Sequence, residues 1–379
     1  MSFAQRVAAK FLRLLILFSF CCLLVACSSV DAQTQPRATG QQQVPTTAPQ
    51  PSATSAPPQL LRPDLERGMV YPVWSQQAYG FGDSTWQQGV ETMKTQTGAT
   101  WVEMPIVLRQ SSASSFDLGP DSNTVNLDSF GNGIHRAVSL GYHVFFVPLT
   151  DVVARGQWAG VIEYQSQQQM QVWFDRYWNA LKPYAEVAQE AGAEQMAIGT
   201  ELEWLSAHAP ASFWNQLIAR VQSVFKGTLT YDMNWWPSLT QTPPSWFKNP
   251  GLAKIGLSEY VPLVDNAQRV DPSAMPALWK SKVGKLVDNF AAQVGKPLIL
   301  SEIGYRNTSD ALFNPYSGSS SSPTDTQEQA AAFAAVLINV FADTHIDGLF
   351  FWAWDNVGKL AIVGQQGVQV IHRWYTKTA

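Results

Sequence analysis

Two glutamates stand where short apolar runs of the chain come to an end. Glu201 follows "MAIGT" and Glu302 follows "LILS", and both runs are typical of buried strands. Burying a carboxylate is costly unless the group is paired or has a chemical task. Two carboxylic acids that face each other can cleave a glycosidic bond, because one protonates the leaving oxygen while the other attacks or stabilises the anomeric carbon.

Flat aromatic side chains end several runs of the same kind. The chain has 15 tryptophans in 379 residues, and four of them close strand-like segments: Trp74, Trp235, Trp352 and Trp354. An indole ring has a large amphipathic surface that can stack on the apolar face of a pyranose. We therefore expect these four side chains to bind sugar.

Other hydrolytic chemistries find less support. The five histidines lack the HxH or HExxH spacing of a metal site, and only His208 lies just beyond a strand-like run. The Gly-x-Ser-x-Gly turn of a serine hydrolase is absent from the sequence. All three cysteines precede residue 28, so the rest of the chain has neither a disulfide nor a thiolate site. We expect no metal and no organic cofactor.

Eight strand-like segments that alternate with helical ones would position these residues. They begin at Gly68, Ala99, Tyr142, Glu194, Gly227, Ala253, Lys296 and Ile346. Strands that alternate with helices pair in parallel, and eight such repeats close a (β/α)8 TIM barrel. A doubly wound open sheet is the alternative, but the glycine-rich loop that it usually carries after its first strand is lacking. The sequence therefore predicts an α/β fold of the TIM-barrel class.

Helix signals fill the segments between the strands. Residues 84–98, 170–192, 212–227 and 326–344 carry apolar residues at helical spacing, and glycines close the first three. Residues 111–132 are rich in Ser, Asp and Asn, which predicts a loop over the top of the barrel.

The barrel would bring the candidate residues to one rim, because active sites of such barrels lie at the C-terminal ends of the strands. Glu201 and Glu302 end the fourth and seventh strands, which face each other across the mouth, and Asp151 follows the third strand. Three further carboxylates stand near strand ends, where supporting or structural roles are expected: Glu103, Glu203 and Asp355.

The N-terminal residues resemble a bacterial export signal. Residues 1–26 combine three basic residues with the apolar run "LLILFSFCCLLVA", and "LVAC" places Cys27 where a lipoprotein signal peptide is cleaved and the cysteine lipidated. Residues 27–66 are rich in Pro, Gln and Thr and predict a disordered tether. The chain would thus be exported and lipid-anchored to the outer face of the bacterial cell membrane, with residues 67–379 as one domain.

Loss of the leader would lower the formal charge from −4 to about −7, because the leader holds three basic and no acidic residues. That balance argues against nucleic acid as a partner and favours a neutral substrate.

Longer motifs around the two glutamates resemble a known family. "GTEL" and "SEIGYRN", together with "LTYDMNWW", "IGLSEYVPL" and "GLFFWAWD", are similar to glycoside hydrolase family 113, a clan-A family of retaining (β/α)8 β-mannanases. The resemblance covers roughly residues 68–356. It departs from the family at "FVPLTD", where a polar run with a histidine is expected, and at Glu259, where a neutral residue is usual.

The resemblance implies a role for each matching residue. Glu201 would be the general acid/base and Glu302 the nucleophile of an endo-β-1,4-mannanase acting on β-linked polysaccharide. Tyr260 would hydrogen-bond the nucleophile, Asn234 would face the site, and Trp352 or Trp354 would form the floor of the sugar site. Another clan-A glycanase, an exo-mannosidase, or a surface lipoprotein that binds glycan without cleaving it are the alternatives.

Overall fold

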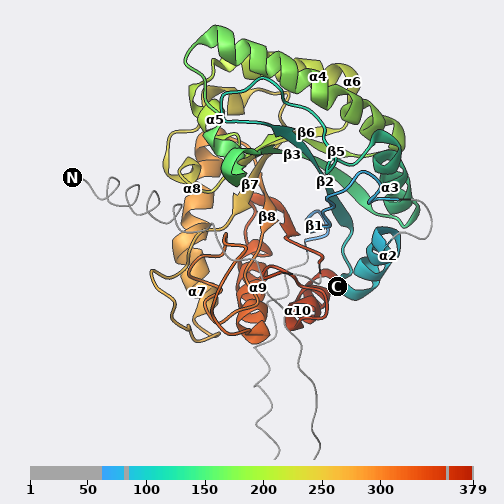
Figure 1. Cartoon of the computed structure of the whole chain (residues 1–379). Helices are drawn as coiled ribbons and strands as arrows, with labels where there is room; N and C mark the ends of the chain where they lie inside the picture. The colour runs from blue at the N-terminus through green and yellow to red at the C-terminus, as the bar shows by residue number, and fades with distance from the viewer. Residues whose placement is uncertain (1–61, 81–84, 356–357, 378–379) are drawn as a thin grey trace, which may run out of the picture. The chain divides into compact units, whose positions relative to one another are not determined.

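The computed structural model describes residues 62–80, 85–355 and 358–377 (Figure 1). The predicted signal peptide, the lipidation site at Cys27 and most of the predicted tether lie outside the described residues. Strand β1 begins at Glu66, the last residue that was assigned to the tether, and Leu65 before it is already buried. The folded part of the chain therefore starts slightly earlier than its composition indicates.

Eight parallel strands close into a barrel, as the alternating pattern predicted. In barrel order they are β1 (Glu66–Val70), β2 (Trp101–Gln110), β3 (His143–Val152), β5 (Gln195–Thr200), β6 (Thr228–Asn234), β7 (Ile255–Glu259), β8 (Leu298–Ile303) and β9 (Ile346–Phe351). Each strand pairs with its neighbour in this order, and β1 closes the ring by pairing with β9. The open-sheet alternative is thereby excluded.

One additional strand extends this ring. β4 (Gln157–Trp158) has two residues and folds back antiparallel onto the end of β3. It was not expected from the sequence, and it adds an indole at the C-terminal end of the third barrel strand.

Helices surround the barrel in Figure 1. Their bounds are α2 (Thr85–Thr97), α3 (Leu127–Ser139), α4 (Gln167–Ala191), α5 (Glu203–His208), α6 (Ala211–Val224), α7 (Met275–Trp279), α8 (Lys285–Val294), α9 (Thr326–Val340) and α10 (Gln366–Tyr375). All four predicted helices are present. Of the described helices, none is both long and apolar enough to cross a membrane.

Local sequence explains where two of the helices begin. The Asn126 side chain accepts a hydrogen bond from the Ser129 N–H, which caps α3 and ends the predicted loop about six residues early. α4 begins with a reciprocal capping box between Ser166 and Gln169 and ends at Gly192, whose φ of 96° suits glycine.

The core has two layers, because parallel strands are buried on both faces. Inside the barrel lies a small apolar cluster of Val70, Phe145, Val147, Ala197, Ile299 and Phe350, and a much larger cluster fills the space between the strands and the helices. At the N-terminal end of the barrel the interior is polar: buried Glu66 forms an ion pair with Lys254 and accepts a hydrogen bond from Gln195. An ion pair thus stabilises the N-terminal end of the barrel, and the C-terminal end is the one at which active sites of such barrels lie.

Candidate active site

Local irregularities of the strands aim both glutamates at the mouth of the barrel. The register between β5 and β6 shifts between Ala197 and Thr200, and that between β8 and β9 shifts between Leu300 and Ile303. Such bulges turn a side chain out of the normal alternation. Glu201 itself has a φ of 50°, which is uncommon for a residue with a side chain and is enriched at functional sites.

Glu201 is held by two donors, one on each carboxylate oxygen. The Asn234 Nδ2 donates to Oε1 at 3.0 Å, and the Trp158 Nε1 donates to Oε2 at 2.5 Å. Burial raises the pKa of Glu201, while the side chains of Trp158, Ser258 and Asn234 act in the opposite direction because they favour the charged form. Asn234 was expected to face the site from the fifth barrel strand, and the structure places its side chain against Glu201.

Glu302 accepts a hydrogen bond from the Tyr260 hydroxyl, which lies 3.0 Å from Oε2. Burial and then the charge of Glu201 raise the pKa of Glu302 well above its ordinary value, and the Tyr260 bond opposes this rise. The pKa of Glu302 thus depends on whether Glu201 is charged, and two carboxylates linked in this way titrate together. The two glutamates therefore act on one another across the mouth, as their strands predicted.

The residues after Glu302 support it without pairing with its charge. The guanidinium of buried Arg306 bonds Asp310 at 2.8 Å, so Arg306 is committed elsewhere. At Gly304 a Cβ would lie 2.9 Å from the carbonyl oxygen of Trp352, so glycine permits the close approach of β8 and the segment after β9. The SEIGYRN motif is thus one reactive group followed by residues that fix the backbone.

Two further carboxylates lie beneath the pair, inside the barrel. Glu103 and Asp232 are almost completely buried, and both oxygens of Glu103 have no hydrogen-bond partner within the described part of the chain. Burial raises the pKa of both groups well above the ordinary range, and each feels the charge of other carboxylates. A Cβ at Gly256 would lie 1.8 Å from Asp232 Oδ1, so glycine on β7 makes room for this acid. Glu103 was expected near the strand end, but β2 continues for seven residues beyond it.

Glu203 and Glu259 are two further carboxylates near the site. The Ser238 hydroxyl lies 3.0 Å from each oxygen of Glu203, and burial raises the pKa of this glutamate to about 7. Glu259 accepts a hydrogen bond from the Val261 N–H at 2.9 Å, and burial raises its pKa to about 7 as well. Glu259 is buried at the end of β7, where Trp279 Nε1 donates to it, and this environment indicates a structural role.

The predicted aromatic residues divide between the rim and the core. Trp74 is 46% exposed after β1, and Trp352 is partly exposed above the inner barrel cluster. Trp235 is half-buried and stacks on Tyr316 with ring centres 6.1 Å apart. Trp354 was expected to bind sugar, and this is wrong: it is 3% exposed and packs in the outer core, so its ring offers no surface to a ligand.

Asp151 lies at the rim but is bound to another side chain. Its Oδ2 is 3.1 Å from the Arg109 guanidinium, which also pairs with Asp121 at 3.3 Å. About half of the Asp151 side chain stays exposed, so its second oxygen is accessible. This cluster ties the loop after β2 to the end of β3.

Two rim residues were not identified from the sequence. Trp158 contacts Glu201 from the short strand β4, and Tyr316 extends the surface of Trp235 from the loop after β8. Both are exposed aromatic residues that lie outside the eight barrel strands. Their only signal in the sequence was an aromatic residue in a polar, non-periodic segment.

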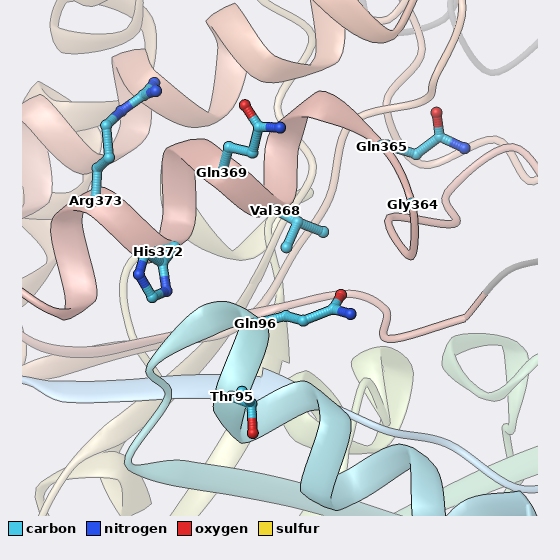
Figure 2. Close-up of a pocket in the computed structure, with 8 residues that line it drawn as sticks. All are labelled: Thr95, Gln96, Gly364, Gln365, Val368, Gln369, His372 and Arg373. Atoms are coloured by element: carbon cyan, nitrogen blue, oxygen red, sulfur yellow. The ribbon is translucent and has the colours of Figure 1, made fainter.

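Cavities and clusters elsewhere are separate from the two glutamates. A groove of about 460 Å³ lies between α2 and α10, and none of the eight lining residues drawn in Figure 2 is a carboxylate. Asp288, Asp343 and His345 bring three possible metal ligands within 4.8 Å of one another. They lie on α8 and before the start of β9, which is the opposite end of the strand from Trp352.

Known proteins identify the family. The family model for glycoside hydrolase family 113 matches residues 70–362. The chain belongs to glycoside hydrolase family 113. It is therefore a glycoside hydrolase with a (β/α)8 barrel, and no curated protein sequence matches it.

Solved structures of low sequence identity share the fold. A family 113 β-1,4-mannanase in a complex has a TM-score of 0.70 at 21% identity, over 83% of this chain and 99% of that one. The family 113 β-mannanase from Alicyclobacillus acidocaldarius, solved with ManMIm, gives 0.70 and 21% over 82% and 97%. A family 5 mannosidase from Rhizomucor miehei gives 0.57 and 14% over 82% and 92%.

Proposed function

We propose that this family 113 protein is a retaining endo-β-1,4-mannanase with Glu302 as nucleophile and Glu201 as general acid/base. Glu302 attacks the anomeric carbon as Glu201 gives its proton to the leaving oxygen, and a covalent glycosyl-enzyme forms. Glu201 then takes a proton from water, whose oxygen displaces Glu302 from the sugar. The observation that carries this proposal is the convergence of two interacting carboxylates from β5 and β8, each with its own donors.

The donors around each carboxylate suit these roles. Tyr260 stabilises the ionised form of Glu302, which is the form that attacks. Trp158 and Asn234 stabilise ionised Glu201, which is the form left after the proton has been given to the leaving group. As the glycosidic bond breaks, positive charge develops at the anomeric carbon beside Glu302, and the leaving oxygen beside Glu201 becomes more basic. Both changes favour ionised Glu302 and transfer of the proton from Glu201.

A β-1,4-linked mannan is the proposed substrate. Trp158 contacts Glu201, and further tryptophans follow the barrel strands at the same rim, where aromatic rings can stack on pyranose rings. Trp74, Trp235 and Trp352 are proposed to contact the sugar chain, together with the free oxygen of Asp151. Support for mannan comes from the β-mannanases that share the fold.

Hydrolysis of a panel of soluble β-glycans by wild type, Glu201→Ala and Glu302→Ala tests the proposal. Wild type is expected to release oligosaccharides from β-1,4-mannan, and both variants are expected to lose this activity while keeping the wild-type melting temperature. Release of sugar only from glucan or xylan would reassign the substrate. Binding of mannan without release of sugar would refute the enzymatic function, and normal turnover by Glu302→Ala would refute the site.

We also propose that the protein is exported and anchored by lipid on Cys27, because "LVAC" follows a basic and then an apolar segment. Fractionation of bacterial cells tests this idea. The wild-type chain is expected in the membrane fraction, and Cys27→Ala is expected to lose lipid labelling. Equal labelling of both forms would contradict the anchor.

A further inference from the structure

Trp158 reaches the site from a small addition to the barrel. Its strand β4 pairs with the end of β3, with Asp151 opposite Trp158 and Val152 opposite Gln157. A tight turn that includes Gly156, with a φ of 55°, connects the two strands. The pairing fixes the height of the indole at the C-terminal rim, level with the last residues of the third barrel strand.

The single donor of this indole is used on a carboxylate. Trp158 Nε1 lies 2.5 Å from Glu201 Oε2, and the other Glu201 oxygen is already taken by Asn234. A hydrogen bond from N–H to a carboxylate is stronger than one between neutral groups. The indole is nonetheless 40% exposed, although a tryptophan packed only for stability would be expected to be covered.

The neighbouring residues hold the ring in this place. Ala159 and Ile162 are buried on the C-terminal side of Trp158 and anchor the segment in the core. At Gly160 an added Cβ would lie 2.1 Å from the indole, so glycine leaves space for the ring. The residues that follow Trp158 therefore hold its indole in the position from which it contacts Glu201.

We propose that Trp158 is a positioning residue for the acid/base, which fixes the orientation of the Glu201 carboxylate and stabilises its ionised form. The inference rests on the proposed function of Glu201. When Glu201 gives its proton to the leaving oxygen, the C–O electron pair goes to that oxygen and a negative charge stays on the carboxylate. The N–H of Trp158 already donates a hydrogen bond to this carboxylate and stabilises the charge, so no reorganisation is needed at that moment.

Other ionisable groups also face Glu201 and set the background for a test. Glu203 from α5, Asp232 from β6 and Glu302 from β8 interact with its charge, as does Tyr260 after β7. Their influence on Glu201 is common to wild type and to a Trp158 variant. A change that appears only in the variant therefore reports the indole N–H.

The test compares Trp158→Phe with wild type in kcat/KM as a function of pH, on β-1,4-mannooligosaccharide. Phenylalanine keeps an aromatic ring but lacks the donor, so Glu201 should hold its proton to higher pH. The alkaline limb is expected to move up by about one pH unit. A structural role alone would lower kcat/KM by one factor at every pH and leave the limb in place, which would overturn the proposal.

Two more variants guard against indirect effects. Gly160→Ala keeps the indole N–H but displaces the ring, and it is expected to move the alkaline limb in the same direction. Trp236→Phe removes another exposed indole, which lies beside Trp235 rather than on Glu201, and its alkaline limb should coincide with that of wild type. An equal shift in Trp236→Phe would refute the specific role of Trp158.

A titration without substrate separates this proposal from the proposed function. The side-chain carbons of 13C-labelled glutamate are followed by NMR in the full chain, and the Glu201 signal is assigned from its absence in Glu201→Gln. The Glu201 midpoint is expected to rise by about one pH unit in Trp158→Phe, even if no β-glycan is cleaved. An unchanged or lower midpoint would overturn the inference.

Discussion

Removal of the Tyr260 hydroxyl tests whether Glu302 acts as an ionised nucleophile. The hydroxyl lies 3.0 Å from Glu302 Oε2, and Tyr260 is only 7% exposed, so water does not readily replace it. A hydrogen bond to a charged group contributes about 1.5–3 kcal/mol. If the bond is present at full strength in the transition state, Tyr260→Phe should lower kcat/KM by about 10- to 150-fold.

The same change should alter the pH profile in a defined direction. The bond from Tyr260 favours the charged form of Glu302, so its loss raises the pKa of this carboxyl further. Attack requires ionised Glu302, so the acidic limb of kcat/KM is expected to move to higher pH by about one to two units. Kinetics on a soluble β-1,4-mannooligosaccharide between pH 4 and 9 would measure both effects.

A matched control comes from Tyr316, whose exposed hydroxyl donates to Asn314 Oδ1 rather than to a catalytic group. Tyr316→Phe should keep the wild-type position of the acidic limb. The reasoning would be refuted if the limb of Tyr260→Phe stayed in place or moved to lower pH while the variant remained folded.

Three further predictions concern the stability of the fold at Glu259 and at Gly256, and the catalytic role of Glu201. Burial raises the pKa of Glu259 from 4.5 to about 7, so the protonated form stabilises the fold below pH 4.5, and this contribution of about 3 kcal/mol is lost as pH rises through 7. Glu259→Gln should therefore make the melting temperature less dependent on pH between pH 5 and 8. Parallel curves of melting temperature against pH for wild type and variant would contradict this. Gly256→Ala is expected to lower the free energy of unfolding in urea by about 1–3 kcal/mol because the added Cβ meets Asp232. Gly119→Ala, whose Cβ enters open space, should have a stability close to that of wild type. Equal stability of the two variants would show that the barrel accommodates the Cβ at Gly256 and would contradict the prediction. Glu201→Ala should lower activity on mannan by about 100- to 10,000-fold. With an activated aryl mannoside and azide, this variant should form a β-mannosyl azide, because azide displaces Glu302 from the covalent intermediate. Formation of an α-mannosyl azide would instead assign the nucleophile to Glu201.

The periodic parts of the chain were predictable from the sequence. Continuous apolar runs bounded by turn residues gave all eight barrel strands, because parallel strands are buried on both faces. The barrel then placed Glu201 and Glu302 at one rim, and the longer motifs indicated Asn234 and Tyr260 as their neighbours. The strands and the placement of the two glutamates follow from regular elements and strand order, whereas Asn234 and Tyr260 were indicated by the family resemblance of the longer motifs.

The remaining features depend on where regular structure stops. Trp352 and Trp354 lie two residues apart, which would place both on one face of a strand, but β9 ends at Phe351 and the alternation does not continue. Glu103 was assigned to a strand end although β2 continues to Gln110. Trp158 belongs to a two-residue strand whose position is set by pairing with β3, and no local pattern reports such pairing.

The most direct test of the central claim is the configuration of the first product of mannan hydrolysis. Proton NMR of the anomeric signals, recorded within minutes of adding enzyme to β-1,4-mannooligosaccharide, separates β from α products before mutarotation mixes them. A covalent intermediate on Glu302 predicts that the β-anomer appears first and then equilibrates. Initial release of the α-anomer would mean direct displacement by water and would contradict the roles assigned to Glu201 and Glu302.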